Sequence, residues 1–515
     1  MKNKFTLFFA ILVMAVASCT KPDDHMCNDQ DVLLKEKPNP VPIPAGDPMT
    51  KMQLDQTVIG LLESRNDFHW EWVDMKTLWS ATQYGDHSVA IGYKPADAGD
   101  ISKKLHTINI KSDSYKRVHE ALVELILDEL NKTATKPVSW QEILIEDDQT
   151  LPIITIRLTD KNTLTKLFNL VNVRYIEPLD YWPTSAERVA AASGCSGSTT
   201  ALNAADYTTI TPGARLPWNF NNHTIPAAWN VSQGQNMTVG VIDAGISSAQ
   251  PLLNGLFNNG DSNVGRTVST DFTLGTSAFN SCTHGTSMSG QATGPRNNQN
   301  SSTGVAYKSN LHFIRASDDV VLDASAEKTA VKNALIRMGN RVDVKIISMS
   351  IGAPFASSVL KDGVDYAYGM GKLIMAAAGT SLSWTSWWGV IYPAAYSSCV
   401  AVTGVKESGA RCSDCHDGSQ VLYTITMERS ASSSRNSISL AYSSLTPTYI
   451  GGSSCATATA AGIASLVWSA RPNMTRAQVL SCMTNTAQFY PNRNSTKGYG
   501  NLNASAAVNY AVANY

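Results

Sequence analysis

The sequence predicts an α/β protein in two parts, a large parallel sheet flanked by helices and, before it, a small ferredoxin-like α+β domain. From residue 216 onward, short apolar strands alternate with helical patterns, which is typical of a parallel sheet covered by helices. Between about residues 86 and 183 the order is strand, helix, hairpin, helix, strand, as in ferredoxin-like domains. The chain has 515 residues, enough for two or three domains, and its formal net charge of −1 predicts no nucleic-acid partner.

The first elements of the chain are an export signal and a polar tether. Two lysines precede the apolar run of residues 5–17, the pattern of a secretory signal peptide ending at residue 18. The sequence VASC, ending at Cys19, resembles a bacterial lipobox and implies lipidation of Cys19; an ordinary signal peptide with an incidental cysteine is the alternative. Residues 19–49 are polar and predict a disordered tether. We therefore expect an exported lipoprotein on the outer membrane or cell surface.

The small domain follows within residues 50–183, with its ferredoxin-like core at about 86–183. Residues 87–93 and 105–111 both qualify as its first strand, and residues 112–131 form its clearest helix, with four apolar residues on one face. Two strands joined by an acidic turn, a second helix and a last strand are expected at residues 142–146, 153–158, 162–172 and 173–177. Residues 184–215 are rich in Ala, Ser, Thr and Gly without a sustained period, so a linker is predicted there.

The large domain, residues 216–515, is built from alternating strands and helices. Its helices include residues 324–338 and a small-residue helix that starts in the stretch GGSSCATATAAG of residues 451–462. Its strands are expected at residues 237–242, 311–316, 344–349, 373–378 and 399–405.

Cysteines permit disulfides in an exported chain, but the sequence does not give their pairing. Eight of the nine cysteines follow Cys19. Cys412 and Cys415 form a CxxC without a second pair at zinc-finger spacing. This spacing predicts a local disulfide or two free thiols rather than a metal site.

Three short stretches place a reactive side chain at a strand end or a helix start. Asp243 ends an apolar strand, His284 precedes a Gly and a Thr that can start a helix, and Ser453 and Ser454 open the small-residue helix. A serine becomes a nucleophile when a histidine takes its proton, and a carboxylate fixes the tautomer of that histidine. Each residue alone is more often structural. In the order Asp, His, Ser on one α/β framework they predict nucleophilic catalysis.

The surrounding motifs resemble those of the subtilisin-like serine proteases, the subtilases, across residues 217–515. VIDAGI around Asp243 resembles the Asp motif, and HGTSMSG from His284 resembles the His motif with Ser289 in place of Ala. In GGSSCATATAAG the family register selects Ser454 over Ser453, and also over Cys455, as the nucleophile. The segments GVAYKSNL and GYGNLN resemble two further family segments. The resemblance implies hydrolysis of peptide bonds, with Ser454 attacking, His284 moving the proton and Asp243 orienting His284.

The family also implies a peptide-binding strand and an oxyanion hole. The strand is SMSIG, and a plain core strand is the alternative. In the oxyanion hole the family's Asn is Thr380 here, beside the Ser454 backbone, and losing that Asn side chain costs on the order of 100- to 1000-fold in turnover. We therefore expect a slower enzyme; a catalytically impaired subtilase-fold protein that binds peptides without cleaving them and a surface adhesin are the alternatives. The residues of the strand are Ser348, Met349, Ser350, Ile351 and Gly352.

The small domain resembles the inhibitory, fold-assisting prodomain of the same family; an unrelated binding domain is the alternative. This implies a zymogen that is cut within residues 184–215, with the lipid anchor at Cys19 left on the prodomain side. The implied partners are polypeptide substrates, the chain's own prodomain, and the membrane before processing. No cofactor is required. Structural calcium is common in the family, but no acidic loop here has a calcium-ligand spacing.

Overall fold

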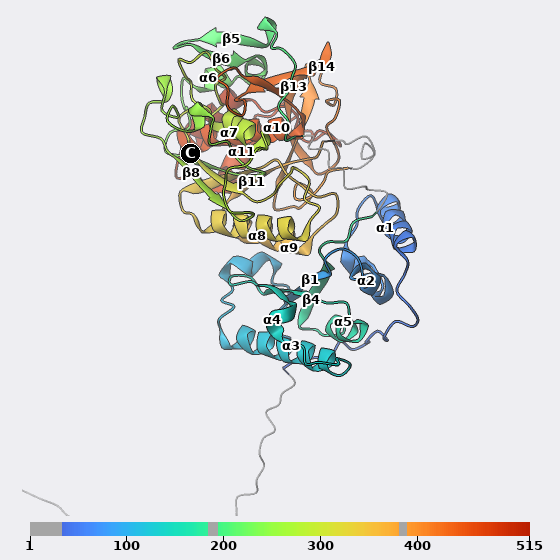
Figure 1. Cartoon of the computed structure of the whole chain (residues 1–515). Coiled ribbons are helices and arrows are strands. Elements are labelled where there is room, and N and C mark those ends of the chain that lie inside the picture. Colours follow the sequence, from blue (N-terminus) through green and yellow to red (C-terminus); the bar gives the residue numbers. More distant parts are fainter. Residues whose placement is uncertain (1–32, 184–193, 381–388) are drawn as a thin grey trace, which may run out of the picture.

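A computed structural model describes residues 33–183, 194–380 and 389–515, which form a small and a large domain (Figure 1). The predicted signal peptide and Cys19 lie outside the described residues. No helix in the described ranges combines the length and apolar character that crossing a membrane requires.

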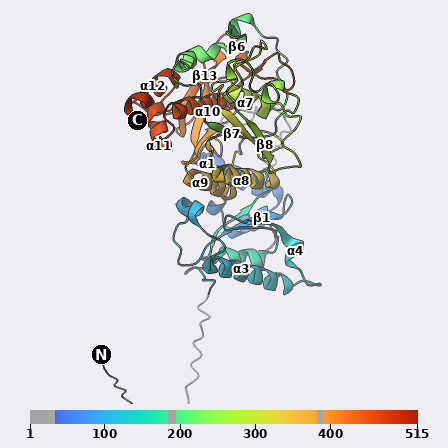
Figure 2. The same cartoon turned by 90° about the vertical axis from the view of Figure 1, so that its left-hand side faces the viewer.

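The small domain contains a four-stranded antiparallel sheet in the order β2-β3-β1-β4. Helices α3 and α5 pack on the face of this sheet that is turned away from the large domain (Figures 1 and 2). The elements after the first two helices follow the predicted order, except that the short helix α4 was not predicted and includes residues 142 and 143 of the predicted strand 142–146. They are α1 (Lys51–Arg65), α2 (Met75–Ala81), β1 (Ser88–Tyr93), α3 (Asp113–Asn131), α4 (Trp140–Ile143), β2 (Leu144–Asp147), β3 (Ile153–Arg157), α5 (Lys161–Phe168) and β4 (Val173–Pro178).

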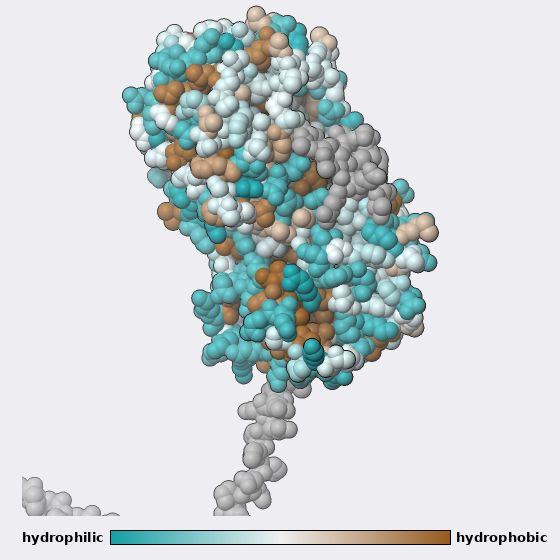
Figure 3. Space-filling model, viewed as in Figure 1, coloured by the Kyte–Doolittle hydropathy of each residue, from teal (hydrophilic) through white to brown (hydrophobic). Residues whose placement is uncertain are grey.

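Two expectations for the N-terminal half differ from the structure. Of the two candidates for the first strand, residues 105–111 are wrong, because Ser102–Thr107 form a 3₁₀ helix that buries Leu105 between the sheet and the large domain. The predicted disordered tether reached residue 49, but residues 33–49 lie against the small domain. There Lys35 N–H donates to Asn172 Oδ1 and Val41 N–H donates to Asn169 Oδ1, each at 2.8 Å. Apolar residues gather among hydrophilic ones on the face of the small domain seen in Figure 3.

The large domain is organised around a nine-stranded sheet in the order β15-β14-β13-β12-β11-β10-β7-β9-β8. Along the sheet, every neighbouring pair of strands between β8 at one edge and β13 is parallel. The β13-β14 and β14-β15 pairs at the other edge are antiparallel. The parallel sheet predicted from the alternating pattern is thus confirmed. The strands are β7 (Thr238–Asp243), β8 (Val268–Phe272), β9 (Asn310–Arg315), β10 (Val344–Met349), β11 (Leu373–Ala377), β12 (Val400–Lys406), β13 (Val421–Arg429), β14 (Ser432–Ser439) and β15 (Thr448–Ile450).

Helices cover both faces of this sheet (Figures 1 and 2). Two of them, α8 and α9, form the layer that faces the small domain, and the remaining helices pack on the opposite face. A separate hairpin of β5 (Tyr207–Ile210) and β6 (Ala214–Pro217) lies at the far end. The helices are α6 (Ile225–Ala228), α7 (His284–Thr293), α8 (Ser325–Asn340), α9 (Ser358–Gly369), α10 (Gly452–Ala470), α11 (Arg476–Asn485) and α12 (Ala504–Asn514).

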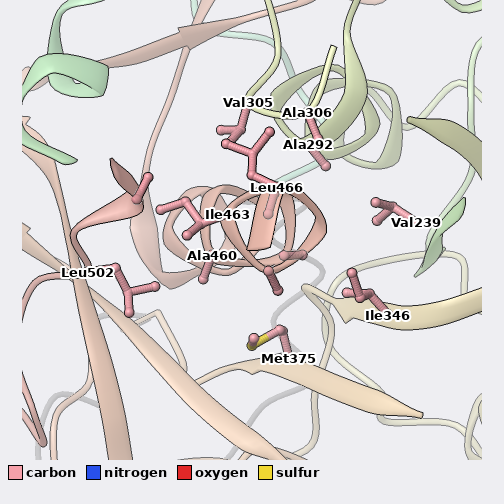
Figure 4. Packing of buried hydrophobic residues seen from close by; sticks show 14 of the residues in the cluster. Val239, Ala292, Val305, Ala306, Ile346, Met375, Ala460, Ile463, Leu466 and Leu502 are labelled. Atoms are coloured by element: carbon pink, nitrogen blue, oxygen red, sulfur yellow. The ribbon is translucent and has the colours of Figure 1, made fainter. Parts of the chain in front are cut away.

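Helix α10 forms the centre of the large core (Figure 4). It is apolar all round and almost wholly buried, as expected of a helix in the interior of a large domain. Its small residues let the sheet and α7 approach closely. Because β7, β10 and β11 are parallel, their carboxyl ends meet at one edge of the sheet, where α10 begins and where α/β proteins place their ligand sites. The residues labelled around α10 in Figure 4 include Ile346, Met375, Val239 and Ala292.

The described part of the predicted linker belongs to the large domain. Cys195 forms a disulfide with Cys282. Asp206 is fully buried and pairs with Arg429 and Arg435 at 2.9 and 2.7 Å. Residues 194–215 are therefore attached to the large domain rather than forming a free connection.

Candidate active site

Asp243 and His284 form a buried pair at the carboxyl edge of the sheet. Asp243 is the last residue of β7 and is fully buried, and His284 is the first residue of α7 and 6% exposed. Asp243 Oδ1 lies 2.7 Å from His284 Nδ1 and also accepts a hydrogen bond from the Ala244 N–H at 2.8 Å. A carboxylate at this distance fixes the Nδ1–H tautomer and leaves Nε2 to accept a proton.

Ser454 lies in the first turn of α10, where amide groups have no helical partners. The helical hydrogen bonds here begin with Cys455 N–H to the Gly451 carbonyl, so the Ser454 amide precedes them. Ser454 Oγ donates to the Ser350 carbonyl at 3.3 Å and not to the His284 ring. Hydrogen bonds between catalytic groups are often long or absent without substrate, so this geometry is compatible with a nucleophile at rest.

The two neighbours of Ser454 have other surroundings. Ser453 is buried and its Oγ accepts a hydrogen bond from the Gly379 N–H at 3.1 Å. Cys455 is fully buried, and burial raises the pKa of its thiol to about 12. A thiol with such a pKa stays protonated at neutral pH and is a poor nucleophile. Both observations favour Ser454, the residue that the sequence register selected.

Thr380 lies on the exposed rim at the start of α10. Its Oγ1 accepts a hydrogen bond from the Ser453 N–H at 3.3 Å and lies 3.1 Å from Ser453 Oγ. If Ser453 Oγ is the donor in the second contact, the hydroxyl proton of Thr380 is free to point into the site. The close approach requires a glycine at position 452, where φ is +69° and a Cβ atom would lie 2.7 Å from Thr380 Oγ1.

Two features beside His284 were not predicted. Asp319 is half-buried, and burial raises the pKa of its carboxyl while the charge of protonated His284 opposes that rise. Cys195 is joined to Cys282, and its carbonyl accepts from the Thr283 N–H at 3.0 Å. Gly194 lies so close that a Cβ atom there would be 3.0 Å from His284 Cδ2. Neither Asp319 nor the disulfide belongs to a sequence motif. The sequence indicated that the cysteines could form disulfides, but not which cysteines pair.

The predicted peptide-binding stretch divides into two parts. Ser348 and Met349 end β10, which is paired on both sides, so they are core residues and not an edge. Ser350, Ile351 and Gly352 continue past the sheet. The Ser350 carbonyl faces Ser454, but the main-chain groups of Gly352 are already paired with Val320 and Leu322, both at 2.9 Å.

In the described ranges, the other cysteines and the acidic residues do not gather into a metal centre. Cys412 and Cys415 form the local disulfide that was one of the two expectations. Among the described residues, no group of three or more His, Cys, Asp or Glu side chains is arranged to hold a metal ion.

Comparison with known proteins identifies relatives of the large domain. The sequence model of the subtilase family matches residues 234–500. Thermitase from Thermoactinomyces vulgaris is 28% identical over 286 residues, which cover 55% of this chain and 93% of thermitase. Subtilisin E from Bacillus subtilis is 32% identical over 295 residues, covering 57% of this chain and 71% of subtilisin E. Among solved structures, MycP1 from Mycobacterium smegmatis superposes with a TM-score of 0.46 at 18% identity, covering 59% of this chain and 87% of MycP1.

Proposed function

Because this chain belongs to the subtilase family of serine proteases, we propose that it is an endopeptidase that cleaves polypeptides through an acyl-enzyme on Ser454. The observation that carries the proposal is the buried pair of Asp243 and His284, 2.7 Å apart, at the start of helix α7, which packs against the helix α10 that holds Ser454 in its first turn. A carboxylate, an imidazole and a hydroxyl at a helix N-terminus are the groups that acyl transfer requires.

In the proposed reaction, Ser454 Oγ attacks the scissile carbonyl while His284 Nε2 takes its proton. Asp243 holds the Nδ1–H and stabilises the imidazolium that forms. The negative oxygen is held by the Ser454 amide, with the α10 dipole behind it, and by the Thr380 hydroxyl. His284 then gives the proton to the leaving amine, and a water molecule activated by His284 releases the acyl group.

We further propose that the small domain is a prodomain, because it packs against the N-termini of helices α8 and α9 of the large domain. Glu177 lies at the N-terminus of α9, where its carboxylate accepts from the Ser358 N–H at 2.5 Å and the Val359 N–H at 3.4 Å. At the N-terminus of α8, Ser325 Oγ donates to Asp86 at 2.6 Å. Acidic residues at both helix N-termini complement the helix dipoles, which favours binding of this domain to a folded large domain.

The end of the small domain also leads toward the cleft. Trp182 lies with its ring centroid 5.6 Å from that of Phe355, which follows the peptide-binding stretch. The chain beyond Trp182 is attached to the large domain again from Cys195 onward. We therefore place the processing cut before Gly194, in the first third of the predicted interval. With the anchor at Cys19 on the prodomain side, the cut would leave the protease without a covalent link to the membrane.

Labelling with a fluorophosphonate tests the proposal, together with processing of the full chain. The wild type is expected to label and to be shortened, and Ser454→Ala to do neither while its circular dichroism spectrum shows that it is folded. N-terminal sequencing of the shortened form locates the cut. A wild type that neither labels nor matures would contradict the enzyme and favour the alternative, an impaired protein that binds extended peptides.

A further inference from the structure

The chain that leaves β10 presents main-chain groups to the cleft at every second residue. The Ser350 carbonyl faces Ser454 Oγ at 3.3 Å, while Ala353 exchanges hydrogen bonds of 2.7 and 2.9 Å with Tyr392 on the other side. Because extended residues alternate in the direction of their polar groups, Gly352 faces the same side as Ser350. We number substrate residues backward from position 1, which carries the scissile carbonyl. The N–H of position 1 then meets Ser350, and position 3 meets Gly352.

In this protein the main-chain N–H and carbonyl of Gly352 already form hydrogen bonds within the chain. Its N–H donates to the Val320 carbonyl at 2.9 Å, and its carbonyl accepts from the Leu322 N–H at 2.9 Å. The segment 320–322 therefore runs as a short parallel strand beside Gly352, with Val321 opposite it. It occupies the place in which the main chain of position 3 would form its hydrogen bonds.

The segment 320–322 is fixed at both ends. Glu327, in the first turn of α8, accepts hydrogen bonds from Asp318 N–H at 3.0 Å and from Asp323 N–H at 3.2 Å. Inside the loop, the Leu322 side chain is fully buried in the core beneath α8. Val320 packs against Gly194, where a Cβ atom would lie 2.8 Å from Val320 Cγ1, and the disulfide of Cys195 holds Gly194 in place.

We propose that segment 320–322 closes the cleft beyond position 2, so that this protease recognises the main chain of only two residues before the scissile bond. The inference rests on the proteolytic function proposed above. Substrates keep the hydrogen bond from position 1 to Ser350 and gain none at Gly352. A peptide extended to positions 3 and 4 should therefore be cleaved little better than one that stops at position 2.

The test compares peptides of one sequence, with two, three or four residues before the scissile bond, as substrates of the processed protease. A third and fourth residue should change kcat/KM by less than about 3-fold, whereas two added main-chain hydrogen bonds would raise it by about 10-fold or more. N-methylation of the position 3 amide should have no effect. N-methylation of the position 1 amide is the matched control and should lower kcat/KM about 10-fold. A rise of 10-fold with length, or a 10-fold loss on N-methylation at position 3, would overturn the inference.

The variant Glu327→Ala releases both ends of the loop. It should gain the dependence on position 3 that the wild type lacks, and its melting temperature shows whether it is folded. The wild-type peptide series decides the inference even if this variant does not fold. If no peptide is cleaved and no fluorophosphonate label is found, the proteolytic function fails and the inference with it. If peptides are cleaved with a strong dependence on position 3, the inference is overturned but the proteolytic function stands.

Discussion

The hydroxyl of Ser454 is bound to the Ser350 carbonyl, and in the proposed reaction its acceptor is the His284 ring. In the described structure the proton goes to Ser350, at 3.3 Å. A bound peptide would use that same carbonyl for its position 1 N–H, so substrate would displace the serine proton from it. Ser454 would then turn to His284. Binding of the peptide main chain can thus complete the catalytic hydrogen bond that is absent without substrate.

The first prediction concerns Thr380. Thr380→Val keeps the shape of the side chain and removes the hydroxyl, and we expect kcat to fall about 10-fold with KM little changed. This is less than the roughly 100- to 1000-fold attributed to an Asn donor, because the threonine hydroxyl reaches less far. Thr380→Ser should retain most of the activity. An unchanged kcat in Thr380→Val would mean that backbone amides alone hold the oxyanion.

A second prediction concerns the acid Asp319 beside His284. The negative charge of Asp319 interacts favourably with the positive charge of protonated His284, and Asp319→Asn removes that interaction. We expect the acid limb of the pH profile of kcat/KM to move down by about half a pH unit. The control is Asp318→Asn, because Asp318 is exposed and pairs with Arg315 instead. An equal shift in the control, or a shift to higher pH, would contradict this role.

At the scale of elements, the start of α7 is held from outside the helix. The disulfide between Cys195 and Cys282 ends two residues before His284, and the Thr283 N–H bonds the Cys195 carbonyl at 3.0 Å. Together these contacts fix the turn that leads into the helix. The segment after the proposed cut would therefore remain packed beside His284.

The third prediction follows from this attachment. Replacing both Cys195 and Cys282 with Ser should lower kcat about 10-fold, because small displacements of a catalytic base are costly, while the peptide-binding residues stay in place and KM changes little. The matched control is the double serine variant of Cys412 and Cys415, the other described disulfide, which should leave kcat within about 2-fold. Equal losses in the two variants would show a general effect on folding rather than a role at His284.

Helices and strands with a clear pattern of apolar residues could be predicted from the sequence, and contacts between loops could not. Strands β7, β9, β10, β11 and β12 are mostly apolar and lie at the predicted positions, whereas β14 is largely polar and was not predicted. The helix after Ala324 begins and ends within two residues of its predicted bounds. Asp243, His284 and Ser454 could be proposed from the sequence because each lies in a motif, at the end of β7, at the start of α7 and in the first turn of α10. The pairing of Gly352 with segment 320–322 joins residues about thirty positions apart through main-chain atoms, which no side-chain pattern encodes.

The same limit appears in the small domain. Its central helix α3 carries a clear apolar stripe and was predicted almost to the residue. The candidate strand at residues 105–111 has a suitable local composition, but Leu105 is buried against the large domain, and this tertiary contact decides its conformation. Helix α1 has a thin buried stripe of Leu54, Val58 and Leu62, which does not reveal the partner it packs against.

At the scale of the whole molecule, charged side chains join the two domains. Arg174 on β4 makes two hydrogen bonds, of 2.7 and 2.8 Å, to the buried carboxylate of Asp362 on α9. Lys332 on α8 is fully buried and contacts Glu146 at 2.8 Å as well as Asp148. Such pairs specify one orientation of the domains more than they add net stability, since each charge must lose its water.

The last prediction uses the pair of Arg174 and Asp362. Arg174→Ala leaves Asp362 buried and, within the part of the small domain that the structure describes, hydrogen-bonded only to the Tyr175 hydroxyl, 3.0 Å away. Removing one partner of a buried ion pair costs about 3–5 kcal/mol, so the small domain should hold the processed protease at least about 100-fold less tightly. Progress curves of peptide cleavage after processing measure this as a shorter lag before full activity. Arg157→Ala is the control, because Arg157 is exposed on β3, which β1 separates from β4 in the same sheet, and this variant should leave the lag unchanged. If both variants keep the wild-type lag, the small domain does not inhibit through this interface, and its identification as a prodomain would have to be abandoned.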